Sequence, residues 1–362
     1  ESRGLGDVYK RQPFSRMARS AQPFPSLLPS PHASSVPRFK RRRYGQRRFG
    51  QAVPGFTNWG GRGKMPLSQF VTSVKFLRVG MNDLRWTSFD LIFFDCDSTL
   101  SAIEGIDELA RLKGKEWRVG VLTEKAMNGD LDLAEVYGKR LQAIRPTRGQ
   151  LKAIEERYWE TLVADAAQVI AALRFLGKQV FIVSGGLAEP VRGFGKRLGI
   201  PPENIRAVEL EYNELSGDWW RYYQPETRAR QTYLDYDDGP LTVSSGKPAI
   251  IQALAAGKHG RRLMIGDGVS DLMARSVVDL FIGFGGVVAR PKVEQGADIF
   301  IRAQSLAPVL PLAAGPAGYA RVLGTPYQAV FNRGIALARG ASVAFKTDDL
   351  QLTFRRAFEE QA

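Results

Sequence analysis

One stretch, residues 89–100, constrains the fold of this chain more than any other. It reads Phe89-Asp-Leu-Ile-Phe-Phe-Asp-Cys-Asp-Ser-Thr-Leu100, and its first half has the apolar composition of a buried parallel strand. The strand ends in Asp95 and Asp97, which would face the same side because side chains two residues apart share one face. Two buried like charges are costly unless a metal or a substrate uses them. An acidic turn that closes a strand, with Ser98 and Thr99 capping a helix, is the alternative interpretation.

The composition excludes several kinds of site. The 362 residues are 44% hydrophobic, enough for a sizeable core, and the length alone allows two or three domains. No apolar run reaches the ~18 residues of a membrane-spanning helix. The single cysteine, Cys96, rules out an internal disulfide. The two histidines, His32 and His259, are too few and too far apart for a histidine metal site or a catalytic histidine pair.

The net charge of +14 is concentrated at the N-terminal end. Residues 1–64 hold 14 Lys/Arg and 2 Asp/Glu, whereas the remainder holds 37 and 35. Residues 1–80 have no periodic apolar pattern and are rich in Pro, Ser, Gly and Arg, so we expect a disordered basic lead. Residues 2–12 resemble the translated read-through of a transposon-end adapter used for sequencing libraries. Part of the lead would then be an artefact, with Met65 and Met81 as candidate true starts.

Two other interpretations of the lead stay open. It could be a transit peptide that begins at Met17, which would direct the protein to a plastid instead of the cytoplasm, the location otherwise expected. It could also be a nucleic-acid-binding arm, because aromatic residues interleave with arginines over residues 38–48. The near-neutral remainder of the chain argues against the arm. We therefore expect neither a nucleic-acid partner nor a membrane partner.

Helical spacing follows the first strand. Apolar residues recur at positions 103, 106, 109 and 112, and a second helix is predicted over about 131–145, where Pro146 ends it. Residues 150–176 read as one or two more helices. This block lies between the first strand and the next one. We therefore expect it to be an insertion that covers the end of the first strand.

The next strand, residues 179–184, ends in Ser184-Gly-Gly186, and a helix of about 188–198 follows. Glycines let a backbone approach an anion, and a helix N-terminus favours negative charge. Residues 205–245 suggest a β-hairpin and a loop, with the Trp and Tyr residues packing on the hairpin. Lys247 stands near the start of the following helix, either as a surface lysine or as a phosphate-facing cation.

A second acidic strand end lies at residues 261–271, where a short apolar strand leads into Gly266-Asp-Gly268 and then Asp271. Another short strand covers 278–284, and residues 297–301 are a candidate for the last edge strand. The carboxyl ends of strands in a doubly wound sheet bind ligands at one edge. Carboxylates without His or Cys favour Mg²⁺, and together with a lysine and a hydroxyl they form a phosphoryl-transfer site. The residues expected to converge are Asp95, Asp97, Ser184, Lys247, Asp267 and Asp271.

The order Asp-x-Asp-x-Thr, Ser-Gly-Gly, Gly-Lys and Gly-Asp-x-x-x-Asp resembles the haloacid-dehalogenase-like phosphatases over about residues 89–303. The resemblance implies an α/β fold, a doubly wound, mostly parallel sheet with a helical cap inserted after the first strand and a small β-hairpin flap. The core would span 81–100 and 166–315, and the cap 101–165. Residues 316–362 lie outside the resemblance and are expected to form a helical extension that packs on the core or supports a homodimer.

The same resemblance implies a role for each motif. Asp95 would attack phosphorus and form an aspartyl-phosphate, while Asp97 would protonate the leaving oxygen and then deprotonate water. The implied ligands of Mg²⁺ are Asp95, the backbone carbonyl of Asp97 and Asp267, with Asp271 close by. The groups implied to neutralise the phosphoryl oxygens are Lys247, Ser184 and the amides of Gly185 and Gly186.

The sequence resembles the phosphoserine phosphatases within that family. Glu104 lies nine residues after Asp95, Arg140 stands in a Lys-Arg-Leu context, and Met127 lies in an Ala-Met-Asn-Gly-Asp segment like the one that forms a hydrophobic wall. A phosphoserine ligand needs a carboxylate for its ammonium group and an arginine for its carboxylate. Without the resemblance, Glu104 and Arg140 would be read as a solvated helix face.

Some residues depart from the pattern. Ser270 stands where Asn or Thr is usual, although its hydroxyl can still donate to phosphate, and Leu133 replaces a commoner aromatic residue. Ser270 and Arg290 complete the predicted substrate-binding residues. The implied reaction is hydrolysis of O-phospho-L-serine to serine and phosphate. There are two alternatives. The phosphoryl group could be transferred to an alcohol such as homoserine, or the substrate could be another small phosphomonoester.

Overall fold

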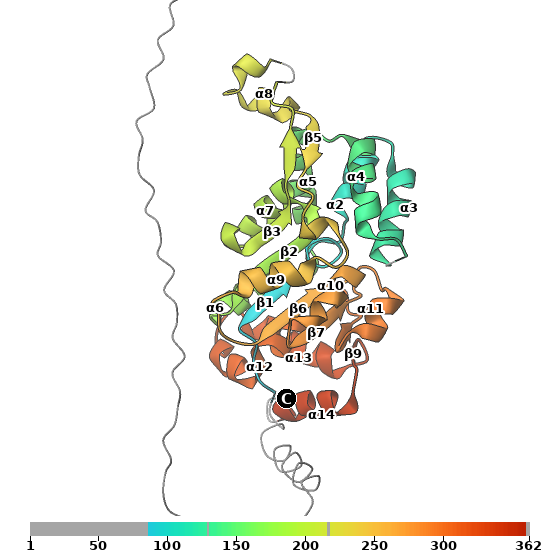
Figure 1. Cartoon of the computed structure of the whole chain (residues 1–362). Coiled ribbons are helices and arrows are strands. Elements are labelled where there is room, and N and C mark those ends of the chain that lie inside the picture. The colour runs from blue at the N-terminus through green and yellow to red at the C-terminus, as the bar shows by residue number, and fades with distance from the viewer. Residues whose placement is uncertain (1–85, 129, 216–217, 360–362) are drawn as a thin grey trace, which may run out of the picture. The chain divides into compact units, whose positions relative to one another are not determined.

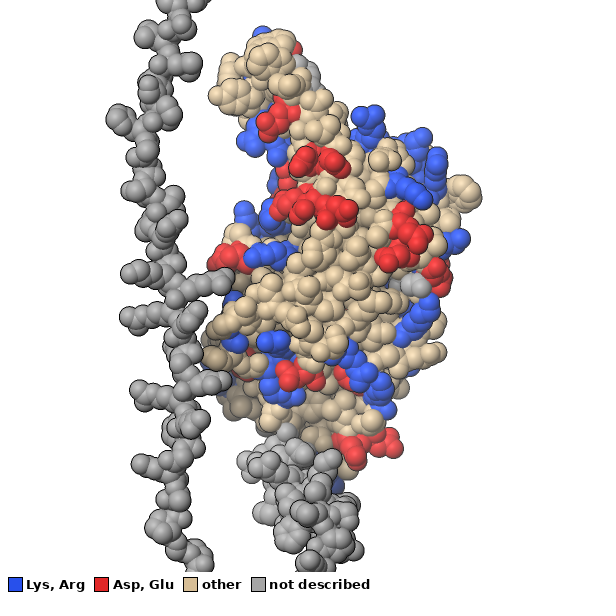
Figure 2. Space-filling view, in the orientation of Figure 1, with Lys and Arg blue, Asp and Glu red and all other residues tan. Residues whose placement is uncertain are grey.

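The computed structural model describes residues 86–128, 130–215 and 218–359, so the basic lead with its candidate starts lies outside the described residues. The described residues belong to one compact unit. None of the helices in this part of the chain combines the length and apolar character needed to cross a bilayer. Lysine, arginine and acidic side chains are interspersed on the face drawn in Figure 2, as expected from the balanced charge after residue 64.

The central sheet confirms the predicted α/β architecture. Its strand order is β3-β2-β1-β6-β7-β8-β9, and every neighbouring pair is parallel except β8 and β9 (Figure 1). Strand β1 lies between β2 and β6, and all four of its residues are buried, as its continuous apolar run predicts. The strands are β1 (Leu91–Phe94), β2 (Gln179–Leu187), β3 (Ile205–Val208), β6 (Arg262–Gly266), β7 (Leu280–Phe284), β8 (Ile299–Ile301) and β9 (Val343–Phe345).

Helices pack on both faces of this sheet (Figure 1). Several follow their strands directly, which brings their N-termini to the carboxyl edge of the sheet. They are α6 (Ala166–Phe175), α7 (Ala188–Arg197), α9 (Lys247–Ala255), α10 (Val269–Met273), α11 (Pro291–Gly296), α12 (Val309–Val322), α13 (Gln328–Arg339) and α14 (Asp348–Ala357). Three single 3₁₀ turns near the sheet are η1 (Pro202–Asn204), η3 (Pro240–Thr242) and η4 (Ala274–Ser276).

The cap consists of four helices between β1 and α6, where the sequence predicts an inserted helical cap. The side chain of Asp132 accepts a hydrogen bond from the Ala134 N–H and so caps one of them. Thr147 and Gln150 form a capping box at the start of the next. The cap helices are α2 (Gly105–Leu112), α3 (Glu116–Met127), α4 (Leu133–Ile144) and α5 (Arg148–Glu160).

The flap is a two-stranded antiparallel ribbon that forms a sheet of its own. The predicted hairpin began too early, because residues 205–208 form β3 and pair with β2 in the main sheet. The ribbon pairs only three register positions, and a long connection with two short helical segments joins its strands. The elements are β4 (Leu210–Tyr212), η2 (Trp219–Arg221), α8 (Pro225–Arg230) and β5 (Tyr233–Tyr236).

The expectation that the flap aromatics pack on the hairpin is wrong. The side chains of the four aromatic residues in the connection are each at least 51% exposed: Trp219, Trp220, Tyr222 and Tyr223. The physical reason is size, because strands of three or four residues offer too little area to cover two Trp and two Tyr rings.

The C-terminal extension packs on the core. The indole N–H of Trp86 donates to the Leu312 carbonyl at 2.9 Å, and the Phe89 N–H donates to the Ala313 carbonyl at 2.8 Å. Both contacts lie next to a kink in α12 at Gly315, whose φ of +62° suits glycine. Residues 297–301 contain β8, but β8 is not the edge, because the chain returns through α12 and α13 and adds β9 outside it.

Phe354 in α14 joins the extension to the start of β1. Its ring is fully buried, with its centroid 5.2 Å from that of Trp86 and 5.0 Å from that of Phe358. Phe354→Ala is expected to lower the free energy of unfolding by about 3–5 kcal/mol, since it removes a large buried ring and leaves a cavity. Urea unfolding measures this loss.

Leu352→Ala is the matched control, because Leu352 lies on the same helix with 44% of its surface exposed. It is expected to change the free energy of unfolding by less than about 1 kcal/mol. Equal losses in the two variants would show that α14 does not pack on the core through Phe354.

Candidate active site

The two carboxylates after β1 turn to different partners. The Asp95 N–H still pairs with the Ile265 carbonyl of β6, so the strand geometry continues to this residue. The Asp95 carboxylate forms an ion pair of 2.9 Å with Lys247 Nζ. Asp97 Oδ1 instead accepts hydrogen bonds from the Gly105 N–H at 2.8 Å and the Tyr158 hydroxyl at 2.7 Å. Both carboxylates are buried, yet they point to separate sets of groups.

Asp95, Asp267 and Asp271 form a cluster that could hold a metal ion. One carboxylate oxygen from each lies within 4.8 Å of the others, and all three residues are buried. The cluster forms because β1 and β6 are neighbours whose carboxyl ends meet at one edge. Three carboxylate oxygens are a donor set that suits a hard cation. The Asp97 carboxylate is not one of the three, and metal binding by the Asp97 backbone carbonyl stays a prediction.

Two buried cations pair with these acids. Lys247 at the start of α9 lies 2.5 Å from Asp271 Oδ1 in addition to its contact with Asp95, and it is 4% exposed. It is therefore not a surface lysine. Arg290 Nε donates to Asp267 Oδ2 at 3.0 Å, and an Arg290 amino group lies 3.8 Å from Glu104 Oε1. Arg290 thus joins the acidic cluster to the cap.

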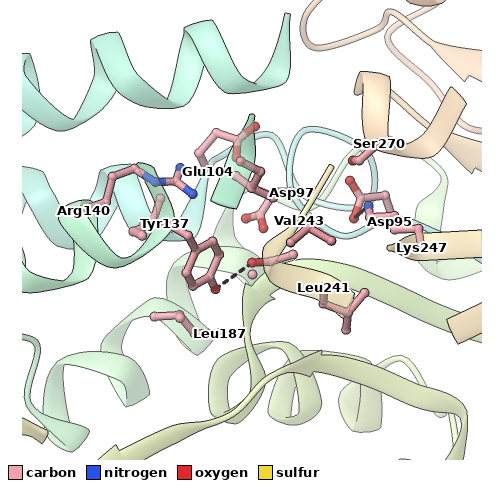
Figure 3. A pocket seen from close by; sticks show the side chains of 14 residues that line it. Asp95, Asp97, Glu104, Tyr137, Arg140, Leu187, Leu241, Val243, Lys247 and Ser270 are labelled. Carbon is pink, nitrogen blue, oxygen red and sulfur yellow. Dashed lines mark hydrogen bonds and ion pairs between the residues drawn. The ribbon is translucent and has the colours of Figure 1, made fainter. Parts of the chain in front are cut away.

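A pocket opens between this cluster and the cap (Figure 3). Most of the predicted catalytic and substrate-binding residues line it together, although they come from β1, the cap, β2, α9 and α10. These are Asp95, Asp97, Glu104, Arg140, Gly185, Gly186, Lys247 and Ser270.

The cap supplies one acidic and one basic side chain to the pocket. Glu104 precedes α2, and its Oε1 accepts a hydrogen bond from the Ser98 hydroxyl at 2.9 Å. Arg140 of α4 is 2% exposed and donates to the Thr123 hydroxyl at 2.9 Å, which in turn donates to Asp107 at 2.6 Å. A solvated helix face is thereby excluded for Arg140. Figure 3 shows both side chains on the cap side of Asp97.

Residues 89–278 match the family model described as a haloacid dehalogenase-like hydrolase. The chain belongs to this family. The chain is similar to the phosphoserine phosphatase of Mus musculus, with 34% identity over 62% of this chain and 94% of that protein. The chloroplastic phosphoserine phosphatase of Arabidopsis thaliana is 32% identical over 60% of this chain and 70% of its own length. The resemblance predicted from the motifs is therefore confirmed.

A solved structure agrees with these sequence matches. It is a phospho-aspartyl intermediate analogue of phosphoserine phosphatase, with a TM-score of 0.52 and 27% identity. It covers 62% of this chain, and the match takes in 98% of that structure. More than half of this haloacid dehalogenase-like hydrolase thus has a solved structural counterpart.

Two predicted substrate-binding residues of this hydrolase, Ser184 and Arg290, do not line the pocket. Ser184 is buried, and its Oγ accepts a hydrogen bond from the Gly186 N–H at 2.9 Å. Arg290 pairs with Asp267, as described above. Met127 ends α3, and its side chain lies outside the described part of the structure. Among the described residues, five apolar side chains line the pocket: Ile106, Leu133, Leu187, Leu241 and Val243.

Two tyrosines at the site were not predicted. The Tyr137 hydroxyl of α4 donates to the Gly185 carbonyl at 2.9 Å and so joins the cap to β2. Its position three residues before Arg140, on the same helix face, is a signal that could have identified it. Tyr158 of α5 contacts Asp97 across 61 residues of sequence, and no local pattern indicates such a contact.

Burial raises the pKa of four carboxyl groups in the pocket and the acidic cluster of this hydrolase. The pKa of Asp97 and that of Asp267 rise to about 7, and those of Glu104 and Asp271 rise to about 8. Neighbouring negative charges add to each shift, chiefly Asp95 for Asp97 and Asp271. Burial by itself would lower the pKa of Lys247, but the negative charges of Asp271 and Asp95 outweigh this effect and raise its pKa. Loss of protons from this cluster is therefore costly unless a cation compensates.

These shifts predict how the stability of the metal-free enzyme depends on pH. A carboxyl whose pKa is higher in the folded than in the unfolded protein adds stability below its unfolded value, and this stability is lost as the pH rises through the folded value. Between about pH 6 and pH 8.5, with a chelator present, the free energy of unfolding is expected to fall by at least about 1.4 kcal/mol, the equivalent of one pKa unit.

Urea unfolding at the two pH values measures this fall. Glu104→Gln is the control, because it removes one of the four titrating groups and should reduce the fall. Added Mg²⁺ should reduce it as well, since a bound cation compensates the ionised carboxylates. A metal-free enzyme that becomes more stable as the pH rises would contradict the assignment.

Proposed function

We propose that this hydrolase is a Mg²⁺-dependent phosphatase that converts O-phospho-L-serine to L-serine and phosphate. The observation that carries the proposal is that Glu104 and Arg140 line the same pocket as Asp95 and Asp97. A carboxylate pairs with an ammonium group, and a guanidinium pairs with a carboxylate through two parallel hydrogen bonds. The pocket therefore offers a partner for each end of a phosphorylated amino acid. The names of the relatives described above support the same substrate.

The bond-making steps use the separated carboxylates of the pocket. A carboxylate oxygen of Asp95 attacks phosphorus as the bond from phosphorus to the serine oxygen breaks, which gives an aspartyl-phosphate. Asp97 gives a proton to the departing serine oxygen and then takes one from the water that attacks the aspartyl-phosphate. The raised pKa of Asp97 suits this exchange, because its neutral form is available near pH 7.

Several groups would bind the phosphoryl oxygens. Lys247 is already between Asp95 and Asp271, so its ammonium is fixed beside the attacking oxygen. Ser270, Gly185 and Gly186 line the same pocket, and the Ser270 hydroxyl and the two glycine amides would donate to these oxygens. Ser184 would contribute after its hydroxyl turns from the Gly186 N–H.

The acidic cluster would hold the metal. Asp95, Asp267 and Asp271 supply hard oxygen donors, and Asp97 would add its backbone carbonyl. When bound there, Mg²⁺ supplies positive charge that polarises the phosphoryl group and offsets the buried acids.

Contacts between cap and core would exclude water during the reaction. The Tyr137 hydroxyl reaches the Gly185 carbonyl, and the Leu133 N–H donates to the Ser244 hydroxyl at 3.0 Å. These hydrogen bonds hold α4, which supplies three pocket-lining residues, against the core. Substrate entry would require them to open, and closure would shield the aspartyl-phosphate from bulk solvent.

The test is phosphate release from O-phospho-L-serine by the purified chain, with Mg²⁺ and with a chelator. Turnover is expected with Mg²⁺, with a loss of at least ~100-fold in the chelator, because the buried acids then lack their counter-charge. Asp95→Asn is expected to abolish turnover, since an amide is not a nucleophile here.

Other substrates and acceptors complete the test. A panel of phosphomonoesters without the amino-acid group should react at least ~10-fold more slowly, because they leave Glu104 and Arg140 unpaired. Faster reaction of another monoester, or phosphorylation of homoserine in place of phosphate release, would replace the proposed reaction. Full activity of the Asp95→Asn variant would remove the aspartyl-phosphate mechanism.

A further inference from the structure

The environment of Asp97 assigns a function to Tyr158, a residue outside the motifs. Tyr158 is fully buried in the last turn of α5, and its ring packs against that of Phe194 with centroids 5.5 Å apart. Its hydroxyl donates to Asp97 Oδ1 at 2.7 Å. Asp97 lies in the catalytic core and Tyr158 in the cap, so this contact joins the two parts directly beneath the pocket.

Two glycines make room for the tyrosine hydroxyl. A Cβ atom at Gly105 would lie 2.2 Å from the Tyr158 hydroxyl oxygen, and one at Gly186 would lie 3.4 Å from it. The Gly105 N–H also donates to Asp97 Oδ1 at 2.8 Å. The same oxygen therefore accepts two hydrogen bonds, one from the Gly105 N–H and one from the Tyr158 hydroxyl.

The second carboxylate oxygen lies elsewhere. A Cβ atom at Gly186 would be 2.6 Å from Asp97 Oδ2, which places this oxygen beside the glycine that lines the pocket wall. Figure 3 shows the Asp97 carboxylate between Glu104 and the pocket residues of the core. Oδ1 thus faces the protein and Oδ2 faces the pocket.

We propose that Tyr158 is a positioning residue: its hydrogen bond to Oδ1 of Asp97 keeps the exchangeable proton of this carboxyl group on Oδ2. Because Oδ1 already accepts two hydrogen bonds, a proton on that oxygen would collide with its donors, so the neutral acid carries its proton on Oδ2. In the first step the Oδ2–H bond breaks and the proton moves to the departing serine oxygen, which keeps the electron pair of its bond to phosphorus. In the second step Oδ2 accepts a proton from the attacking water.

This inference rests on the proposed function, and its test uses the dependence of the rate on the leaving group. A serine alkoxide needs a proton as it departs, whereas acetate leaves acetyl phosphate without one. A misplaced proton donor should therefore slow phosphoserine and spare acetyl phosphate. The value of kcat/KM is the quantity to compare, because it reports the step in which the leaving group departs and not the later hydrolysis.

Tyr158→Phe is expected to lower kcat/KM for phosphoserine by about 10-fold or more, while kcat/KM for acetyl phosphate changes by less than about 2-fold. Tyr319→Phe is the control, because Tyr319 lies in α12 and packs against Phe331 away from the pocket. It should change neither value. Equal losses on both substrates, or no loss on phosphoserine, would overturn the positioning role and leave Tyr158 a packing residue.

Gly105→Ala offers a second route, because its Cβ displaces the tyrosine hydroxyl while the backbone N–H stays in place. It should reproduce the selective loss, and the double variant with Tyr158→Phe should lose no more than the more impaired single variant. Multiplied losses would show that the two residues act independently, contrary to the proposal. A wild-type chain that ignores phosphoserine would refute the proposed function alone, since any alkyl phosphomonoester that it does hydrolyse can replace phosphoserine in the comparison.

Discussion

The site depends on two buried ion pairs, which the Lys247 ammonium forms with the carboxylates of Asp95 and Asp271. They hold three buried charges at the edge where β1, β6 and α9 meet. A buried carboxylate without a partner costs several kcal/mol, so the acids and the lysine require one another. The three carboxylates of Asp95, Asp267 and Asp271 still outnumber the two cations that pair with them, Lys247 and Arg290. That excess of negative charge is what suits the cluster to a divalent cation.

The sheet and the cap place the Asp95 and Asp97 carboxylates in different surroundings. Strand pairing with β6 fixes Asp95 beside the cluster, whereas the turn that follows directs Asp97 under the cap, toward Tyr158 and Gly105. One carboxylate is thereby kept beside cations, and the other is kept in an environment that favours its neutral form. Two acids two residues apart in sequence can for this reason have different functions in one reaction.

Sequence reasoning was strongest where a residue's place follows from strand order. Asp95, Asp267 and Asp271 could be brought together because parallel strands end at one edge, and Lys247 because it begins the helix beside that edge. Glu104 and Arg140 were identified by resemblance to a family, and their spacing alone would have suggested a solvated face.

The residues that sequence reasoning missed depend on tertiary contacts. Tyr158 reaches Asp97 only after four cap helices have folded back, and β9 joins the sheet only after two helices have returned the chain to it. The prediction that the flap aromatics pack on the hairpin was wrong for a related reason. Their composition suggested burial, but the short ribbon has too little surface for them to pack against. Such outcomes depend on the area available in three dimensions, which local patterns do not encode.

In the proposed reaction, Asp95 carries the phosphoryl group and Asp97 carries the proton. The most direct test of this assignment is to quench the enzyme within milliseconds of mixing with ³²P-labelled phosphoserine, reduce the acyl phosphate with borohydride, and map the modified peptide by mass spectrometry. Homoserine is expected at position 95, and Asp97 is expected to be unmodified. Modification at position 97, or rapid turnover with neither residue modified, would contradict it.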